Sequence, residues 1–166
     1  MWLSFALRVS TGPAPADWLV LTQFHTDGDV ADVARSPMLA LTMQGSTFRV
    51  VTRSDPSPVS TSNPAEVIRY SEPSWTRGVW RRLVVRARFE RTGNGRLDVW
   101  QDGVLIFGGD VPMGYNDTED SPYYKHGLYR AADANPMVAE FANVEIGTNS
   151  LASRVTAPLA LPADRA

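Results

Sequence analysis

The chain has 166 residues, which fits one domain, and its hydrophobic fraction of 43% is ordinary for a globular protein. Its formal net charge of −2 excludes the strong overall basic field of many nucleic-acid-binding proteins, and the lack of cysteine excludes disulfides and thiolate metal sites. No apolar run approaches the roughly 20 residues of a membrane-spanning helix, so we expect no membrane partner. The N-terminus lacks a basic segment before its short apolar run, and we expect no signal peptide there.

Short extended runs, divided by clusters of Pro, Gly, Ser and Asp, follow one another along the chain. In chain order, we expect strands over 2–9, 18–26, 38–44, 47–53, 79–90, 96–101, 104–107, 123–131 and 137–146. The segments Gln44-Gly45-Ser46 and Gln101-Asp102-Gly103 are typical of tight hairpin turns, and we expect irregular loops over 54–64 and 108–121. No segment has a long helical period. The pattern predicts an all-β sandwich of two packed antiparallel sheets with almost no helix.

The chain is expected to form a single domain over 1–148. The remaining segment, 149–166, is rich in Ala and Pro and is expected to be a flexible tail.

Two short segments contain the only lysine and the two histidines of the chain. The earlier one is Leu21-Thr22-Gln23-Phe24-His25, and the later one is Tyr123-Tyr124-Lys125-His126-Gly127-Leu128-Tyr129-Arg130. Strand side chains alternate between two sides, so Leu19, Leu21, Gln23 and His25 are expected on one side of the first strand. By the same rule Tyr123, Lys125 and Tyr129 share one side of the other strand, and His126 points to the opposite side.

Together, an amide, an imidazole, an ammonium and a phenol can form a proton-transfer site. These are the groups needed to remove a proton from a carbon beside a carboxylate.

The two segments, with the motifs between them, resemble the heparin lyase and glucuronan lyase group of polysaccharide lyases. The shared order is Gln-aromatic-His, Ser36-Pro37 before a strand, Trp80 opening a long strand, the run 97–103, and Tyr-Tyr-Lys-x-Gly-Leu-Tyr-Arg. The last segment also resembles the Tyr-Phe-Lys-Ala-Gly-Val-Tyr-Asn motif of alginate lyases, and Gln23-x-His25 resembles their Gln-Ile-His motif. The resemblance covers the chain from Trp2 to about Ile146.

This resemblance implies a concanavalin A-like β-jelly roll whose concave sheet grips an anionic polysaccharide such as alginate, glucuronan or a glycosaminoglycan. It also implies a secreted or periplasmic location. Members of these families usually carry a further strand with an Arg-x-Glu motif upstream of the position that matches Trp2. The sequence shows no such strand, so either it lies outside this chain or another Arg holds the substrate carboxylate.

The implied reaction is β-elimination in a uronic-acid polymer. Gln23 and His25 are expected to donate hydrogen bonds to the carboxylate, and Tyr129 is the candidate catalytic base and acid. Lys125 and Tyr123 are candidate substrate-binding residues.

Further candidates lie outside these two segments. Arg82 and Arg86 share one side of the strand over 79–90, and they line either a polyanion groove or a solvated outer face. Three acidic residues of the loop over 108–121 are candidate calcium ligands, with a solvated loop as the default: Asp117, Glu119 and Asp120.

We expect neither a cofactor nor a catalytic metal, and we expect the protein to be a monomer. The alternative to a lyase is a non-catalytic carbohydrate-binding module of the same fold, because fold alone does not determine function.

Overall fold

The computed structural model describes residues 1–116 and 122–159, which contain ten strands and one short 3₁₀-helix, η1 (Ala152–Arg154). The strands are β1 (Trp2–Val9), β2 (Trp18–His25), β3 (Leu39–Gln44), β4 (Thr47–Thr52), β5 (Val67–Glu72), β6 (Arg81–Arg88), β7 (Arg96–Gln101), β8 (Val104–Asp110), β9 (Tyr123–Arg130) and β10 (Ala139–Gly147). Among the described residues, no helix is both long and apolar enough to cross a membrane. The prediction of an all-β protein with almost no helix is confirmed.

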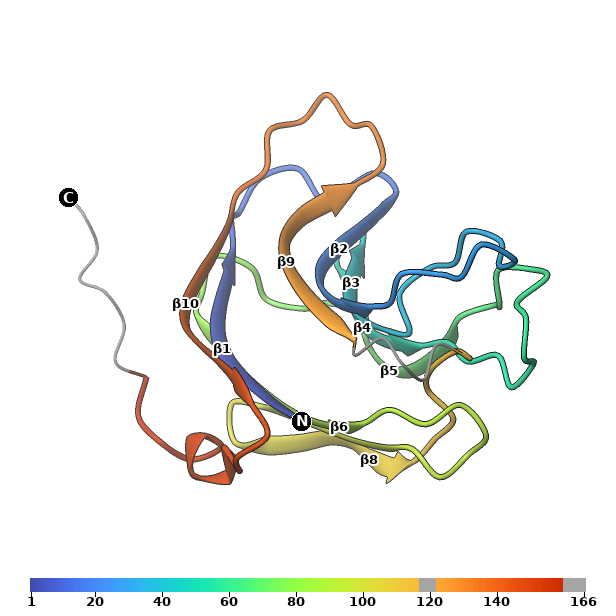
Figure 1. Ribbon diagram of the computed structural model, residues 1–166. Coiled ribbons are helices and arrows are strands. Elements are labelled where there is room, and N and C mark those ends of the chain that lie inside the picture. The colour runs from blue at the N-terminus through green and yellow to red at the C-terminus, as the bar shows by residue number, and fades with distance from the viewer. Residues whose placement is uncertain (117–121, 160–166) are drawn as a thin grey trace.

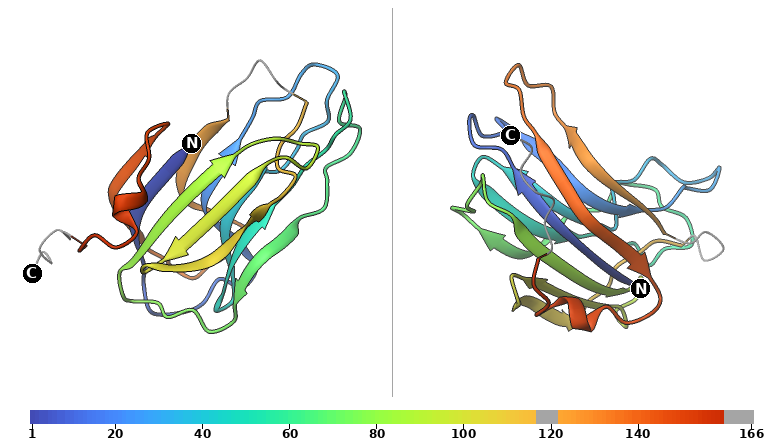
Figure 2. Two further views of the ribbon diagram at one scale, coloured as in Figure 1. Left: turned by 90° about the horizontal axis from the view of Figure 1, so that it is seen from below. Right: turned by 90° about the vertical axis from the view of Figure 1, so that its left-hand side faces the viewer.

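The strands form two antiparallel sheets of five strands each, packed face to face (Figures 1 and 2). Sheet A has the strand order β10-β1-β6-β7-β8, and sheet B has the order β5-β4-β3-β2-β9. Strands that are far apart in the sequence are therefore neighbours: β2 pairs with β9, and β1 lies between β10 and β6. Figure 1 shows that β2 and β9 are strongly curved. This is the predicted jelly-roll sandwich.

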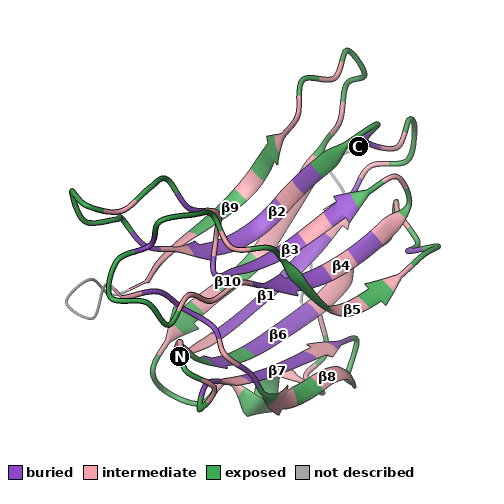
Figure 3. Cartoon of the chain, turned by 90° about the vertical axis from the view of Figure 1, so that its right-hand side faces the viewer, coloured by how far each residue is buried: buried purple, intermediate pink, exposed green. Residues whose placement is uncertain are grey.

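The core lies between the two sheets and is filled by the inward-facing side chains of both. Figure 3 shows buried and more exposed residues alternating along the strands. In β4, Phe48 and Val50 are fully buried in the core, whereas Arg49 between them is not. Such alternation leaves the outward-facing residues of each sheet free for other roles.

The turn between β7 and β8 was predicted correctly. Asp102 and Gly103 have φ angles of 50° and 87°, and they are the two central residues of the hairpin. A two-residue hairpin with positive φ at both central positions is a type I′ turn, for which Asp-Gly is a favoured sequence. Two features differ from expectation: β8 extends to Asp110, beyond its predicted end at 107, and the whole strand β5 was not predicted.

The predicted side-chain alternation of β2 is wrong beyond Leu21. A β-bulge shifts the register between Val20 and Thr22 against both neighbouring strands. Leu19 and Leu21 therefore point into the core, while Gln23 and His25 point to the outer face of sheet B. An extra residue in a bulge exchanges the two faces of a strand from that point onward.

Candidate functional site

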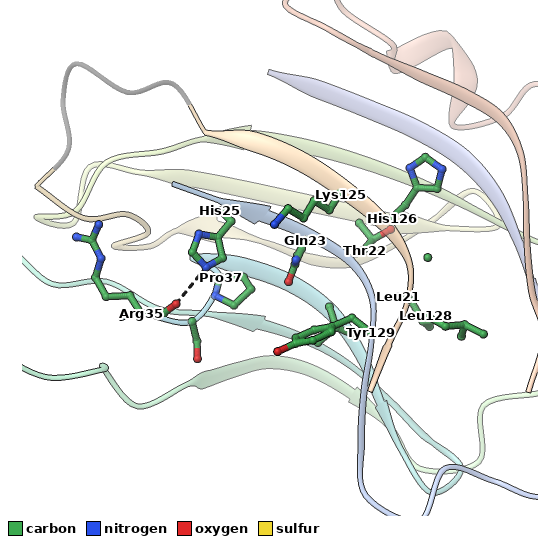
Figure 4. Close-up of a pocket in the computed structure, with 13 residues that line it drawn as sticks. Leu21, Thr22, Gln23, His25, Arg35, Pro37, Lys125, His126, Leu128 and Tyr129 are labelled. Carbon is green, nitrogen blue, oxygen red and sulfur yellow. Dashed lines mark hydrogen bonds between the residues drawn. The ribbon is translucent and has the colours of Figure 1, made fainter. Parts of the chain in front are cut away.

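The predicted site residues of β2 and β9 lie on the outer face of sheet B, and most of them line one cleft. In the antiparallel register, Gln23 is opposite Lys125, His25 is opposite Tyr123, and Val20 is opposite Tyr129. This cleft, which we call the central cleft, has a volume of about 470 Å³. Its lining includes Val20, Gln23, His25, Arg35, Ser36, Pro37, Lys125, Gly127 and Tyr129 (Figure 4).

A second irregularity, in β9, brings Tyr129 into this register. Between the pairs Val20–Tyr129 and Thr22–His126, β9 contains one residue more than β2. Gly127 lies in this stretch and has a φ of +137°, a conformation that side-chain-bearing residues rarely adopt. The glycine of the predicted motif therefore has a geometric reason: its positive φ fits the irregular stretch after which Tyr129 pairs with Val20.

Gly127→Ala tests this role of the bulge. A Cβ at Gly127 has no heavy atom within 4 Å, so only the backbone conformation opposes the substitution. We expect the free energy of unfolding to fall by about 1–3 kcal/mol, as measured by urea denaturation. Gly147→Ala is the matched control, because that position has equally open surroundings and no positive φ. Equal losses in both variants would contradict the argument.

Gln23 is a buried polar residue of the central cleft that lacks a full set of partners among the described residues. Its side chain is 8% exposed, and its amide oxygen is buried without a hydrogen-bond partner among the described residues. An unsatisfied buried polar atom typically costs about 1–3 kcal/mol. Since the oxygen and nitrogen of an amide are assigned from their surroundings, either end can face the cleft. The amide is thus available to a ligand.

His25 is held by two backbone carbonyl groups. Its Nδ1 lies 2.5 Å from the Thr26 oxygen, and its Nε2 lies 3.0 Å from the Arg35 oxygen (Figure 4). A neutral imidazole carries one N–H, so it donates to only one of these carbonyls at a time. The ring also stacks on Tyr123, with centroids 5.5 Å apart. These contacts fix the orientation of the imidazole beside Gln23.

Lys125 and Tyr129 are exposed polar groups of the central cleft, as is His126 between them. The Lys125 ammonium lies 4.7 Å from the centroid of the Tyr123 ring, a cation–π contact that leaves the charge accessible. Tyr129 is 62% exposed, and its ring packs on Trp18 with centroids 5.0 Å apart. Tyr123 therefore supports His25 and Lys125 from the side, while Trp18 supports Tyr129. Sequence reasoning missed Trp18, which shares its face of β2 with Val20.

A buried ionic anchor holds the loop that forms one wall of the cleft. The Arg35 guanidinium is 3.2 Å from the Asp32 carboxylate, donates to Asn116 at 2.8 Å, and lies over the Tyr115 ring. The Ser60 backbone N–H donates to Asp32 and is the main cause that lowers the pKa of this carboxyl group. This anchor positions the Arg35 carbonyl that contacts His25.

Tyr115 holds the next residue of the same wall. Its hydroxyl donates to the Ser36 carbonyl at 2.6 Å, and burial raises the pKa of Tyr115 to about 12. The hydroxyl therefore stays protonated and keeps this hydrogen bond at physiological pH. Ser36 and Pro37 are fixed in place as a result.

A side groove continues from the central cleft across β3 and β4, and it shares Val20, Ser36, Pro37 and Tyr129 with that cleft. Its further lining includes Trp18, Ala40, Thr42, Arg49, Arg53 and Glu66. Sequence reasoning did not single out Arg49 or Arg53. The signal was their alternation with Phe48 and Val50, which places both arginines on the face opposite the core.

Other predicted residues lie elsewhere. Arg82 and Arg86 are on the outer face of sheet A, because Leu83 and Val85 of the same strand point into the core. They face away from the cleft of sheet B and share no surface with it.

The three acidic residues considered as calcium ligands fall within 117–121, outside the described residues. Among the residues that are described, no group of three or more His, Cys, Asp or Glu could hold a metal ion.

Solved structures with the same fold include several lyases. An endo-β-1,4-glucuronan lyase from the fungus Trichoderma reesei superimposes with a TM-score of 0.68 at 18% identity, over 89% of this chain and 68% of that chain. An alginate lyase from Pseudomonas aeruginosa has a TM-score of 0.57 at 18% identity, over 89% and 64%. An alginate lyase from Chlorella virus has a TM-score of 0.58 at 12% identity, over 86% and 69%. The chain thus spans about two thirds of these proteins.

A comparison with curated proteins gives no match. By contrast, the sequence model of the family described as "Polysaccharide lyase" matches residues 1–149, which is most of the chain. The match includes both strands of the central cleft. With the jelly-roll fold, this match shows that the chain belongs to the polysaccharide lyase family.

Proposed function

We propose that the protein is a lyase that cleaves a uronic-acid-containing polysaccharide by β-elimination in the central cleft. The observation that carries the proposal is the buried amide of Gln23, whose oxygen has no partner within the described part of the chain and which shares this cleft with the Lys125 ammonium and the Tyr129 hydroxyl. The cleft thus offers a donor, a positive charge and a proton carrier to one bound sugar. Membership of the lyase family supports the same reading.

Cleavage begins with the sugar carboxylate. Gln23 donates its amide N–H to one carboxylate oxygen, and the nearby positive charge of Lys125 offsets the negative charge of the carboxylate. Neutralising the carboxylate makes the proton on the adjacent C5 more acidic, and donors placed where charge develops supply much of such catalysis. His25 can join them when its Nε2–H donates to the substrate in place of the Arg35 carbonyl, which lies 3.0 Å from Nε2.

Tyr129 carries the proton. The Tyr129 oxygen acts as base in its phenolate form and takes the C5 proton, the C5–H electrons form the C4–C5 double bond, and the C4–O4 bond breaks. The Tyr129 hydroxyl formed in this way then protonates the departing O4, which regenerates the phenolate with no net gain or loss of protons. Tyr129 suits this role because it is exposed at the rim of the cleft and its ring is braced by Trp18.

The substrate class follows from the same groups and from the relatives. A cleft with Lys125, Gln23 and His25 suits carboxylate-bearing sugars, and the solved relatives are named as lyases of glucuronan and alginate. We propose a uronate polymer acted on by a monomer outside the cytoplasm.

The test is incubation of the protein with glucuronan, alginate, hyaluronan and heparin while ultraviolet absorbance is followed, because β-elimination creates an absorbing unsaturated uronate. We expect the absorbance to rise with at least one polymer. Heat-denatured protein is the control. If the absorbance stays flat with all four, the lyase proposal fails.

A second candidate function is a carbohydrate-binding module without catalysis. It is favoured by His25, whose two ring nitrogens both face backbone carbonyls and so offer no free N–H to a substrate. Binding of a uronate polymer without any unsaturated product, measured by calorimetry beside the absorbance assay, would select this function instead.

A further inference from the structure

The side groove connects Tyr129 with Arg49 along a single row of residues. The antiparallel registers pair Tyr129 with Val20, Val20 with Thr42, and Thr42 with Arg49. Arg49 is therefore three strands away, about 14 Å at a spacing of roughly 4.8 Å per strand. Between Tyr129 and Arg49, the side chains of Val20 and Thr42 form the bottom of the groove, and the small Ala40 lies beside them. This leaves space over the sheet for a sugar next to the one at Tyr129.

The charged groups of the central cleft and side groove differ in whether they already have partners. Arg35 pairs with Asp32, and Arg53 pairs with Glu66 at 2.8 Å. The pair of Arg53 and Glu66 therefore adds no net charge to the groove. Arg49 has no acidic partner among the described residues: one of its nitrogens donates to the Gln44 side chain at 2.9 Å, and its Nε is buried without a partner. Gln44 takes one of the five guanidinium N–H donors and the Nε–H is buried, which leaves three donors on the two Nη atoms.

We propose that Arg49 binds the carboxylate of a second uronate residue of the same polymer, while Lys125 binds one near Gln23. This inference rests on the proposed function, because it extends the central cleft into a site for two or more sugars. The polymer crosses β9, β2, β3 and β4 on the outer face of sheet B. A guanidinium suits this role because its planar fork can donate two parallel hydrogen bonds to one carboxylate.

Arg49→Met tests the inference, since it keeps an apolar side chain of similar length and removes the charge. We expect KM for glucuronan to rise roughly tenfold or more, as for loss of a charge-assisted hydrogen bond, with kcat changed little because Arg49 is remote from Tyr129. Affinity is measured in the Tyr129→Phe variant, which we expect to bind the substrate but to cleave it far more slowly. Its affinity for a short oligoglucuronate should fall by the same factor when Arg49→Met is added. Binding of the carboxyl-reduced oligosaccharide should not change.

The matched control is Arg88→Met, which removes one charge from the exposed outer face of sheet A. If it weakens binding as much as Arg49→Met does, the effect is one of net charge, and the inference is overturned. Thermal unfolding of each variant checks its fold, and Arg49→Gln replaces Arg49→Met if the latter unfolds.

The results separate this inference from the proposed function. Normal cleavage with an unchanged KM in Arg49→Met overturns the role of Arg49 and leaves the lyase intact. Binding that depends on Arg49 in a wild-type protein that cleaves nothing supports the role of Arg49 and overturns the lyase. A wild-type protein that neither binds nor cleaves these polymers overturns both.

Discussion

Tyr129→Phe should lower turnover of the preferred uronate polymer by about 100- to 10,000-fold, the usual contribution of general acid–base catalysis. The ring keeps its packing on Trp18, so the substitution removes only the hydroxyl that carries the proton. Substrate affinity should change little, since Gln23, Lys125 and Arg49 remain. Turnover is measured from ultraviolet absorbance, and affinity is measured by calorimetry on the same preparation.

Tyr70→Phe is the control for losing a tyrosine hydroxyl. Tyr70 lies on β5, where its hydroxyl donates to Glu72 at 3.1 Å, and it lines neither the central cleft nor the side groove. Turnover in this variant should match that of the wild type. Equal turnover in Tyr129→Phe and wild type would remove Tyr129 from the mechanism.

Phe24→Ala should reduce the free energy of unfolding by about 3–5 kcal/mol, as large-to-small changes of buried aromatic residues do. Phe24 is 1% exposed, and its ring centroid lies 5.3 Å from that of Phe89 and 5.4 Å from that of Tyr124. It also stands between Gln23 and His25 in the sequence, so its fixed position in the core sets the direction of both side chains. Activity should therefore fall even at temperatures where the variant is still folded.

Urea denaturation measures this loss, with Val30→Ala as the control because Val30 is fully exposed in a loop. The control should change the free energy of unfolding by less than about 0.5 kcal/mol. A loss below about 1 kcal/mol in Phe24→Ala would mean that the core tolerates a cavity there, against the close packing expected of protein interiors.

Much of the fold could be predicted because its signals are local. The Asp102-Gly103 turn depends on two residues that adopt positive φ, and the strand on each side shows its own alternation. The strand β5 was missed because its Val67 and Ile68 are exposed at an edge of sheet B. An edge strand gives little of the inside–outside contrast from which a strand is recognised.

The candidate site was predicted only in part, because face and sheet depend on long-range pairing. The bulge near Leu21 reverses the alternation of β2, and no turn residue marks it in the sequence. The side-chain pattern of β6 was correct, with Leu83 and Val85 inside. Only the strand order shows, however, that Arg82 and Arg86 face away from the cleft. Arg49 drew no attention because its partners in the groove come from other strands.

The most direct test of the account is the mass of the oligosaccharides formed when the wild-type protein is incubated with glucuronan. β-Elimination in the central cleft predicts new non-reducing ends that lack one water relative to hydrolysis and that absorb ultraviolet light. Fragments with fully hydrated ends, or an intact polymer that the protein binds, would contradict it.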